Sequence, residues 1–306
     1  MKYINIAGTD LKASNIIMGC MRIKQLSLPE AEALIRTAME ENVNFFDHAD
    51  IYGGGECEEH FAQAIGMNPS IRDGMILQSK CGIRSGYFDF SKEHILASTD
   101  GILKRLNTDY LDILLLHRPD SLVEPEEVAE AFDQLQASGK VRHFGVSNHT
   151  PLQIELLKKY VKQPLVVNQL QLSVTHTPMI DSGIALNMDH AQSVNRDSGI
   201  LDYSRLHDMT VQAWSPFQKG FFNGPFLGDL ETYPELNKLM DELAAKYEVT
   251  TTAIAVAWIT RHPANIQVIT GTTNVTRLKD SCQGSDIPLT REEWYAMYKA
   301  GGKIVP

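Results

Sequence analysis

Short apolar runs recur along the chain, and each is followed by polar residues. Continuous apolar runs of this length, rich in Val, Ile, Leu and Phe, are typical of strands that are buried on both faces. We interpret eight runs as strands, at residues 15–18, 43–46, 75–77, 111–116, 141–146, 165–167, 210–213 and 266–269.

The segments between most of these runs carry apolar residues three and four positions apart, which is the period of an amphipathic helix. Ser27 precedes Pro29, and Thr150 precedes Pro151, so both positions offer an N-cap followed by a first-turn proline. The predicted helices cover residues 29–41, 92–106, 126–137, 150–160, 234–247 and 251–261. Strands that alternate with helices predict parallel βαβ units.

Eight such units can close into a barrel or form an open, doubly wound sheet. The open sheet usually carries a G-x-G-x-x-G fingerprint after an early strand, and this sequence lacks it. We therefore predict an α/β fold, with a single (β/α)8 TIM barrel domain over residues 1–306 and extended loops at its C-terminal face. The stretch 173–197 is polar and irregular, and we expect it to be a loop over the barrel mouth.

Polar residues follow nearly every predicted strand, and in this barrel the chemistry lies at the carboxyl ends of the strands. Asp47, Lys80 and His117 follow three successive strands, so we expect their side chains to converge. Ionisable groups that meet in a partly dry site shift each other's pKa. The strand ends read Asp47, Ser79-Lys80, His117-Arg118, Ser147-Asn148, Asn168-Gln169, Trp214-Ser215 and Thr270-Gly271-Thr272.

Tyr52 follows Asp47 by five residues, and the three glycines after it suit a loop that folds the phenol back over the mouth. The pKa of free tyrosine is about 10, so proton donation near neutral pH calls for a cation that favours the phenolate. Lys80 is the candidate cation, and Asp47 would pair with it. His117 would donate a hydrogen bond to a carbonyl oxygen. These residues predict an oxyanion site with a proton donor.

Charge and cysteine content narrow the possible partners. The chain has 28 Lys and Arg against 38 Asp and Glu, a net charge of -10, without a basic cluster, so nucleic acid is an unsuitable partner. Its four cysteines lack C-x-x-C spacing, which argues against a zinc ribbon or a disulfide framework. We expect a cytoplasmic protein, because neither a signal peptide nor a membrane-spanning run is present. The oligomeric state stays open, and a monomer is compatible with the sequence.

A metal site is the alternative for the histidines near the predicted mouth. His48, Asp50, His60 and His117 offer suitable ligand types, but they lack the i, i+4 pairing that places ligands on one helical face. Lys80 at the same place would repel a divalent cation. We therefore expect no metal.

Several segments together resemble the aldo-keto reductases over essentially the whole chain, most closely a bacterial branch of weakly characterised oxidoreductases. These segments are Phe46-Asp47-His48-Ala49-Asp50-Ile51-Tyr52-Gly53, Gln78-Ser79-Lys80, Leu115-Leu116-His117-Arg118, Gly139-Lys140-Val141-Arg142-His143-Phe144-Gly145-Val146-Ser147-Asn148 and Ala213-Trp214-Ser215-Pro216. The resemblance implies a catalytic tetrad of Asp47, Tyr52, Lys80 and His117, with Tyr52 as general acid. The reaction it implies is NADPH-dependent reduction of a small aldehyde or ketone.

The resemblance also implies where NADP(H) binds, with the amide held by Ser147, Asn148 and Gln169, the nicotinamide near Trp214 and the 2′-phosphate near Arg277. Thr270, Gly271 and Ser281 stand where many relatives have Pro, Lys and Asn. The loss of that lysine removes one cation near the 2′-phosphate and reduces discrimination against NADH. The implied cofactor residues are Gly19, Met21, Asp47, Ser147, Asn148, Gln169, Trp214, Ser215, Pro216, Phe217, Gly220, Ile269, Gly271, Thr272, Thr273, Arg277 and Asp280.

Two other functions remain open at this point. Relatives of the fold serve as regulatory subunits, so a non-enzymatic NADPH-binding module is possible, and fold alone does not separate it from a reductase. A barrel hydrolase would use Asp47 with Asp50 or Glu56 as acid and base. The mouth loops carry four phenylalanines that suggest an apolar pocket wall, namely Phe88, Phe90, Phe221 and Phe222.

Overall fold

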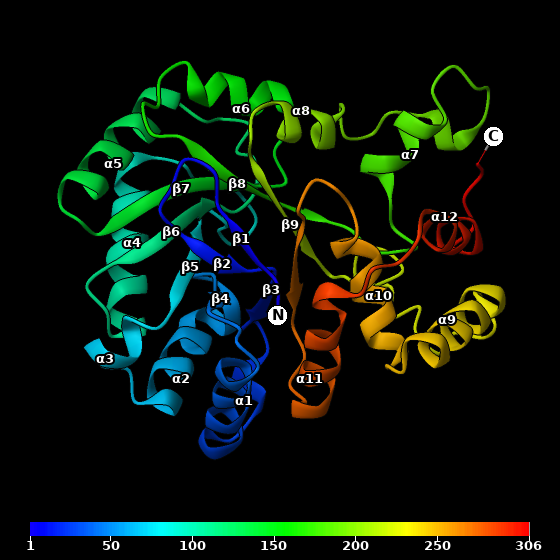
Figure 1. Ribbon diagram of the computed structural model, residues 1–306. Coiled ribbons are helices and arrows are strands. Elements are labelled where there is room, and N and C mark those ends of the chain that lie inside the picture. Colours follow the sequence, from blue (N-terminus) through cyan, green and yellow to red (C-terminus); the bar gives the residue numbers. More distant parts are fainter. Residues whose placement is uncertain (306) are drawn as a thin grey trace.

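The computed structural model describes residues 1–305, in which eight parallel strands close into a barrel (Figure 1). Consecutive barrel strands are hydrogen-bonded neighbours, and β10 closes the ring against β3. The barrel strands are β3 (Ile16–Gly19), β4 (Phe45–Asp47), β5 (Ile76–Cys81), β6 (Leu111–Leu116), β7 (Val141–Ser147), β8 (Leu165–Gln171), β9 (Thr210–Trp214) and β10 (Gln267–Thr270). The predicted (β/α)8 barrel is confirmed, and each predicted strand overlaps one of these.

Helices cover the outside of the barrel, as Figure 1 shows. Ser27 and Thr150 form capping boxes with Glu30 and Gln153, and each is followed by a proline in the first turn. None of the helices within residues 1–305 is long and apolar enough to cross a membrane. The helices are α1 (Leu28–Glu40), α2 (Glu56–Ile65), α3 (Pro69–Arg72), α4 (Lys92–Leu106), α5 (Pro125–Ala137), α6 (Pro151–Lys158), α7 (Pro178–Ile184), α8 (Ile200–Leu206), α9 (Pro234–Tyr247), α10 (Thr251–Thr260), α11 (Val275–Gln283) and α12 (Arg291–Ala300).

The stretch 173–197 is not the irregular loop that we expected, because it contains the short helix α7 and a 3-10 turn at Ala191–Ser193. Asp181 in α7 is buried and accepts hydrogen bonds from the hydroxyls of Thr177, at 2.6 Å, and Tyr298, at 2.7 Å. Tyr298 belongs to α12, so the helix is stabilised by a residue far away in the sequence. A local hydrophobic period could not have shown it.

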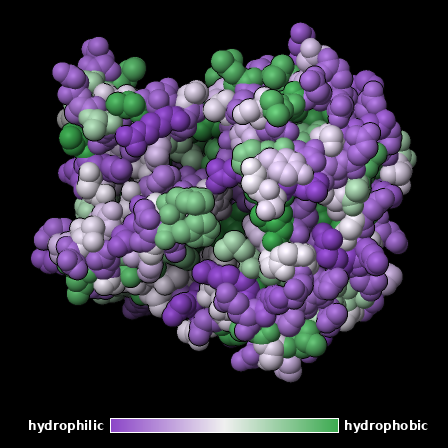
Figure 2. Space-filling view, turned by 180° about the vertical axis from the view of Figure 1, so that it is seen from behind, coloured by the Kyte–Doolittle hydropathy of each residue, from purple (hydrophilic) through white to green (hydrophobic). Residues whose placement is uncertain are grey.

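A small antiparallel hairpin, β1 (Tyr3–Asn5) and β2 (Lys12–Ser14), closes the N-terminal end of the barrel. Ile6, Leu11 and Ala13 are buried in one apolar cluster with residues of the barrel interior, including Phe45 and Ile113. The hairpin crosses in front of the barrel in Figure 1. Figure 2 shows the opposite side, where the surface is hollowed near its centre and apolar side chains lie along the hollow.

Farther along the strands, buried amides form a polar layer inside the barrel. Oε1 of Gln212 accepts hydrogen bonds from Nε2 of Gln78, at 2.8 Å, and of Gln169, at 3.1 Å. The Nε2 of Gln212 donates to Gln267 at 3.0 Å. The same amide nitrogens of Gln78 and Gln169 also donate to Oδ1 of Asp47, at 2.7 Å and 3.0 Å. The layer therefore holds one oxygen of Asp47 in place.

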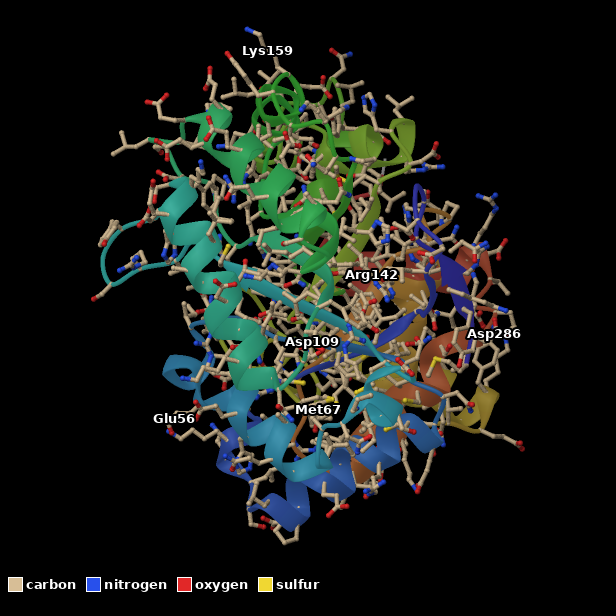
Figure 3. The ribbon with its side chains drawn as sticks, turned by 90° about the vertical axis from the view of Figure 1, so that its left-hand side faces the viewer. Glu56, Met67, Asp109, Arg142, Lys159 and Asp286 are labelled. Carbon is tan, nitrogen blue, oxygen red and sulfur yellow. The ribbon has the colours of Figure 1, made fainter. Side chains whose placement is uncertain are left out.

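A buried carboxylate joins the neighbouring strands β6 and β7 to helix α3 on the side of the barrel drawn in Figure 3. Asp112 accepts hydrogen bonds from the guanidinium groups of Arg72, at 2.7 Å, and Arg142, at 3.1 Å. Both guanidinium groups also lie over the ring of Tyr110, at 3.8 Å and 4.0 Å from its centroid. Arg142 lies against the barrel in this view, whereas Lys159 projects from the edge of the molecule.

Candidate active site

Lys80 lies at the centre of the predicted tetrad, near the end of β5, and is completely buried. Its ammonium nitrogen is 2.7 Å from Oδ2 of Asp47, 2.7 Å from the carbonyl oxygen of His48 and 3.1 Å from the hydroxyl oxygen of Tyr52. An ammonium group has three N–H donors, so all of them have acceptors here. Burial lowers the pKa of Lys80, but Asp47 and Tyr52 outweigh it and the pKa is raised. Lys80 is therefore charged.

Tyr52 reaches Lys80 because the chain after it takes a path that favours glycine. Gly53, Gly54 and Gly55 have φ values of 59°, 68° and 96°, in the left-handed region that residues with a Cβ rarely adopt. The expected loop that folds the phenol back over the mouth is present as the short helical turn Tyr52–Gly55.

Two opposing effects act on the pKa of Tyr52. The Lys80 ammonium lowers it, in the direction that we expected, but burial has the larger effect and the pKa is raised above its ordinary value. The phenol therefore holds its proton. Because its oxygen accepts a hydrogen bond from Lys80, its own O–H is left to donate elsewhere.

His117 follows β6 directly and lies beside Tyr52, with the two rings edge-on and their centroids 6.0 Å apart. Burial, and then the nearby charges of Lys80 and Arg118, hold the pKa of His117 well below its usual range. The imidazole is therefore neutral at pH 7 and has one N–H to donate. Two neutral donors, the Tyr52 hydroxyl and the His117 imidazole, thus border the same part of the mouth.

The residues implied for the cofactor amide form a hydrogen-bonded chain across the ends of β7, β8 and β9. Nδ2 of Asn148 donates to Oγ of Ser147 at 2.7 Å, and this hydroxyl donates to the carbonyl of Gln169 at 3.0 Å. The indole N–H of Trp214 donates to Oδ1 of Asn148 at 3.1 Å. The indole is thereby fixed beside the Asn148 amide. The side chain of Gln169 itself is turned into the barrel, toward Asp47.

The residues implied for the phosphate end gather around the ends of β3 and β10. A Cβ on Gly19 would lie 2.9 Å from Ile269 and 3.4 Å from the carbonyl oxygen of Thr270, so the two strands approach closely at this point. Beyond β10, Asn274 caps α11 by accepting the backbone N–H of Arg277 at 3.0 Å. The guanidinium of Arg277 is exposed there. Arg277 in the first turn of α11 is therefore an exposed cation next to the loop 271–274.

The remaining residues implied for the cofactor lie where the chain leaves β3, β9 and β10. Ser215 adopts a left-handed backbone with φ 53°, so the chain turns sharply after β9. Ile269 is buried in the barrel interior, so its side chain is part of the core. The rest lie on the loops after these strands and in the first turns of α11, at Met21, Pro216, Phe217, Gly220, Gly271, Thr272, Thr273 and Asp280.

Arg22 is a basic residue at the mouth that we did not predict from the sequence. Its Nε and Nη2 donate to the carbonyl oxygen of Gly271, at 3.0 Å and 2.5 Å. The residue follows β3, which neighbours β10 in the closed barrel, so the contact spans almost the full chain. Its position three residues after Gly19, at the end of a predicted strand, was the feature of the sequence that could have placed it at the mouth. Arg22 adds a second cation, beside the loop that precedes α11 and Arg277.

The expected aromatic wall is present only in part. Phe221 and Phe222 are 61% and 62% exposed, and Phe221 stands edge-on to Trp214 with centroids 6.2 Å apart. Phe88 is also exposed. Phe90, in contrast, is buried and stacks on His149, so it belongs to the core and not to the wall.

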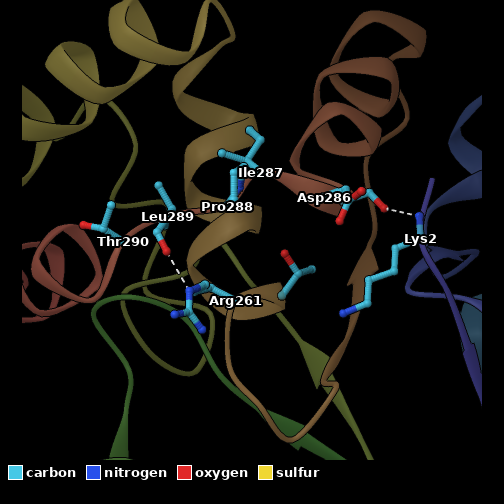
Figure 4. A pocket seen from close by; sticks show the side chains of 9 residues that line it. Lys2, Arg261, Asp286, Ile287, Pro288, Leu289 and Thr290 are labelled. Atoms are coloured by element: carbon cyan, nitrogen blue, oxygen red, sulfur yellow. Dashed lines mark hydrogen bonds between the residues drawn. The ribbon is translucent and has the colours of Figure 1, made fainter.

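Other parts of the described chain offer less for catalysis. Residues 1–305 contain no group of three or more His, Cys, Asp and Glu side chains able to hold a metal ion, and all four cysteines are buried and unpaired. A hollow of about 500 Å³ lies between Lys2, Arg261, Asp286 and residues 287–290 (Figure 4). The guanidinium of Arg261 is already bound there to the carbonyl of Leu289 at 2.6 Å. None of the tetrad residues lines this hollow.

Comparison with known proteins gives the same family over nearly the whole chain. The model of the aldo/keto reductase family matches residues 15–301. The uncharacterized oxidoreductase YcsN of Bacillus subtilis is 34% identical over 98% of both chains, and a 6-dehydroglucose reductase of Agrobacterium fabrum is 32% identical over 94% of both. An aldo/keto reductase from Klebsiella pneumoniae, solved with NADP and acetate, shares the fold with a TM-score of 0.74 at 23% identity, over 94% of this chain and 91% of its own. The protein is a member of the aldo/keto reductase family of oxidoreductases.

Proposed function

We propose that the protein is an NADP(H)-dependent reductase that converts an aldehyde or ketone to an alcohol, with Asp47, Tyr52, Lys80 and His117 as its catalytic residues. The observation that carries this proposal is the chain of contacts from Asp47 through Lys80 to the Tyr52 hydroxyl, beside a neutral His117. A proton donor next to a second hydrogen-bond donor suits a reaction in which negative charge develops on a carbonyl oxygen.

The chain's own residues supply proton transfer and charge stabilisation. NADPH supplies the hydride when it is bound. The Tyr52 O–H and the His117 N–H hold the carbonyl oxygen of the substrate and polarise it. Tyr52 then transfers its proton to this oxygen, and the resulting phenolate lies beside the Lys80 ammonium. Asp47 balances the ammonium charge, so Lys80 stays protonated throughout.

The cofactor proposal rests on the residues at the mouth and on the family. Asn148, Ser147 and Trp214 would hold the nicotinamide, because they present a fixed indole and amide groups beside the tetrad. The loop after β9 would meet the pyrophosphate. Arg277 would bind the 2′-phosphate, and Arg22 would place a second cation close by. The Klebsiella relative of the same fold was solved with NADP, which supports the choice of this dinucleotide.

Titration of the purified protein with NADPH and NADH, followed by fluorescence, tests the cofactor directly. Oxidation of NADPH in the presence of simple aldehydes then tests the reaction. NADPH-preferring binding together with turnover would support the proposal. Binding without turnover of any aldehyde or ketone would favour a regulatory module, and failure to bind either nucleotide would contradict the proposal.

A further inference from the structure

Arg118 is a half-buried arginine at the barrel mouth, directly after His117. Its guanidinium carbon lies 5.8 Å from the ring centroid of Trp214 and 5.8 Å from that of Phe221. Within residues 1–305 it makes these two aromatic contacts and neither a hydrogen bond nor an ion pair. Partial burial lowers the pKa of Arg118, and no carboxylate of this part of the chain lies near enough to offset the shift.

The other arginines that lose solvent in the described part of the chain each have a hydrogen-bond acceptor, which is the carbonyl of Leu289 for Arg261 and a carboxylate for the two that follow. Arg105 binds the buried Glu58 at 2.7 Å, and Arg72 binds the buried Asp112 at 2.7 Å. The chain has 38 acidic residues and a net charge of -10, so carboxylates are abundant. A guanidinium removed from water without a partner costs free energy, which suggests that its partner is supplied from outside the chain.

The surroundings of Arg118 leave its hydrogen-bonding edge available. Cation–π contact with Trp214 and Phe221 holds the planar group in place without using its N–H donors. A guanidinium offers parallel N–H groups that match the two oxygens of a carboxylate. His117 is the preceding residue, so an anion held here lies close to the carbonyl that His117 and Tyr52 would bind.

We propose that Arg118 binds an anionic group on the carbonyl substrate, so that the enzyme prefers aldehydes or ketones that carry a carboxylate. This inference rests on the proposed reductase function. Phosphate has the same recognition chemistry, and the test therefore includes both anions. Because the anion is charged in the bound substrate and in the transition state alike, Arg118 acts mainly on KM.

The first experiment compares charged and neutral aldehydes of the same shape. We would measure kcat/KM for the 2-, 3- and 4-carboxybenzaldehydes against the matching carbamoylbenzaldehydes, and for glyceraldehyde 3-phosphate against glyceraldehyde. The wild type should prefer the charged member of at least one pair by roughly 10- to 100-fold, the range expected for a hydrogen bond to a charged group. The pair that shows the preference identifies the anion.

Three variants assign the preference to this residue. Arg118→Gln should remove most of the preference for the charged aldehyde, by raising the KM of that aldehyde. Arg118→Lys should keep part of the preference, because lysine retains the charge but lacks the paired N–H donors. Arg84→Gln, in a mouth arginine already paired with Asp89, is the matched control and should behave as the wild type. Thermal unfolding verifies that each variant is folded.

Equilibrium binding of benzoate and benzamide to the NADP⁺-loaded protein, measured by calorimetry, tests the inference without turnover. Benzoate should bind more tightly to the wild type, and Arg118→Gln should abolish the difference. If neutral aldehydes are reduced but charged ones gain no advantage, the reductase stands and the inference fails. Equal losses for charged and neutral compounds, or weaker NADPH binding in Arg118→Gln with an unchanged substrate ratio, would also overturn it. If no aldehyde is reduced, the proposed function fails, and benzoate binding still decides the role of Arg118.

Discussion

The ammonium of Lys80 donates a hydrogen bond to the hydroxyl oxygen of Tyr52 over 3.1 Å, while Asp47 and the His48 carbonyl take its other two donors. This direction of donation matters because a phenol that accepts from a cation keeps its own proton available. The burial that raises the pKa of Tyr52 works in the same direction before the reaction. In the proposed reaction the lysine would act after proton transfer, when it would stabilise the phenolate.

Replacement of Tyr52 by Phe removes the proton donor and leaves the ring in place. We expect kcat for aldehyde reduction to fall by about 10²- to 10⁴-fold, the usual contribution of general acid catalysis. The Kd for NADPH should stay within about twofold, since the hydroxyl is not expected to contact the cofactor's binding groups. Steady-state kinetics and fluorescence titration measure the two effects. Tyr87→Phe, in an exposed mouth tyrosine, is the control, and undiminished activity of Tyr52→Phe would show that the proposed donor is wrong.

Removal of the exposed guanidinium at residue 277 should affect one nucleotide only. Arg277→Gln is expected to weaken NADPH binding by roughly tenfold and leave NADH binding unchanged, because only NADPH carries the 2′-phosphate. Arg22→Gln should have a smaller effect, since Arg22 already donates to the Gly271 carbonyl. Lys279→Gln, an exposed residue of the same helix, is the control. Equal losses for both nucleotides would assign Arg277 to another part of the cofactor or to the fold.

The buried amide layer predicts a large loss of stability when Gln212 becomes Leu. The change removes the amide oxygen that accepts hydrogen bonds from Gln78 and Gln169, and the amide N–H that donates to Gln267. Each lost partner of a buried polar group costs about 1–3 kcal/mol, so we expect the free energy of unfolding to fall by roughly 2–5 kcal/mol. Urea unfolding measures it, with the exposed Gln283→Leu as control. A change below about 1 kcal/mol would mean that the layer adapts without Gln212.

Buried histidines should make the protein less stable as the pH falls. Burial lowers the pKa of His149 to about 4, against an ordinary value of about 6.5. Between pH 7 and pH 5 the unfolded chain therefore binds a proton at this residue that the folded chain does not bind. The free energy of unfolding then falls, as the pH is lowered, by up to about 2 kcal/mol for this residue. His149→Gln should flatten the decrease by that amount, and the exposed His207→Gln should not. Urea unfolding at pH 7, 6 and 5 compares the three proteins, and parallel curves for the wild type and His149→Gln would contradict the prediction.

Most of the barrel and the centre of the site followed from the sequence, because both depend on local pattern. The strands are buried on both faces and so appear as apolar runs, and in a barrel the residue after each run must lie at one rim. Asp47, Lys80 and His117 could be placed on this basis alone. The glycines after Tyr52 marked the turn that brings the phenol to Lys80.

The parts that the sequence did not show depend on contacts between distant segments. The strands of the hairpin have three residues each, too few for a period to be visible. Helix α7 depends on the bond from Tyr298 to Asp181, more than 100 residues away. Arg22 was missed because its partner, Gly271, is a neighbour only after the barrel has closed. Phe90 belongs to the core because it is buried, and the pKa of Tyr52 is raised because the phenol is buried. The burial of single side chains could not be read from the sequence.

The β1–β2 hairpin closes the N-terminal end of the barrel, and this affects the order in which ligands of the proposed reductase could bind and leave. Ile6, Leu11 and Ala13 of the hairpin segment pack against the apolar residues of the barrel interior and fill this end of the barrel. In the proposed reductase, substrate and product would enter and leave through the same mouth as the nucleotide, and the outermost molecule would have to leave before the one beneath it could exchange. The order of binding and release would then follow from the depth of each molecule in the mouth, and slow release of the nucleotide would limit turnover however fast the proton transfer from Tyr52 is.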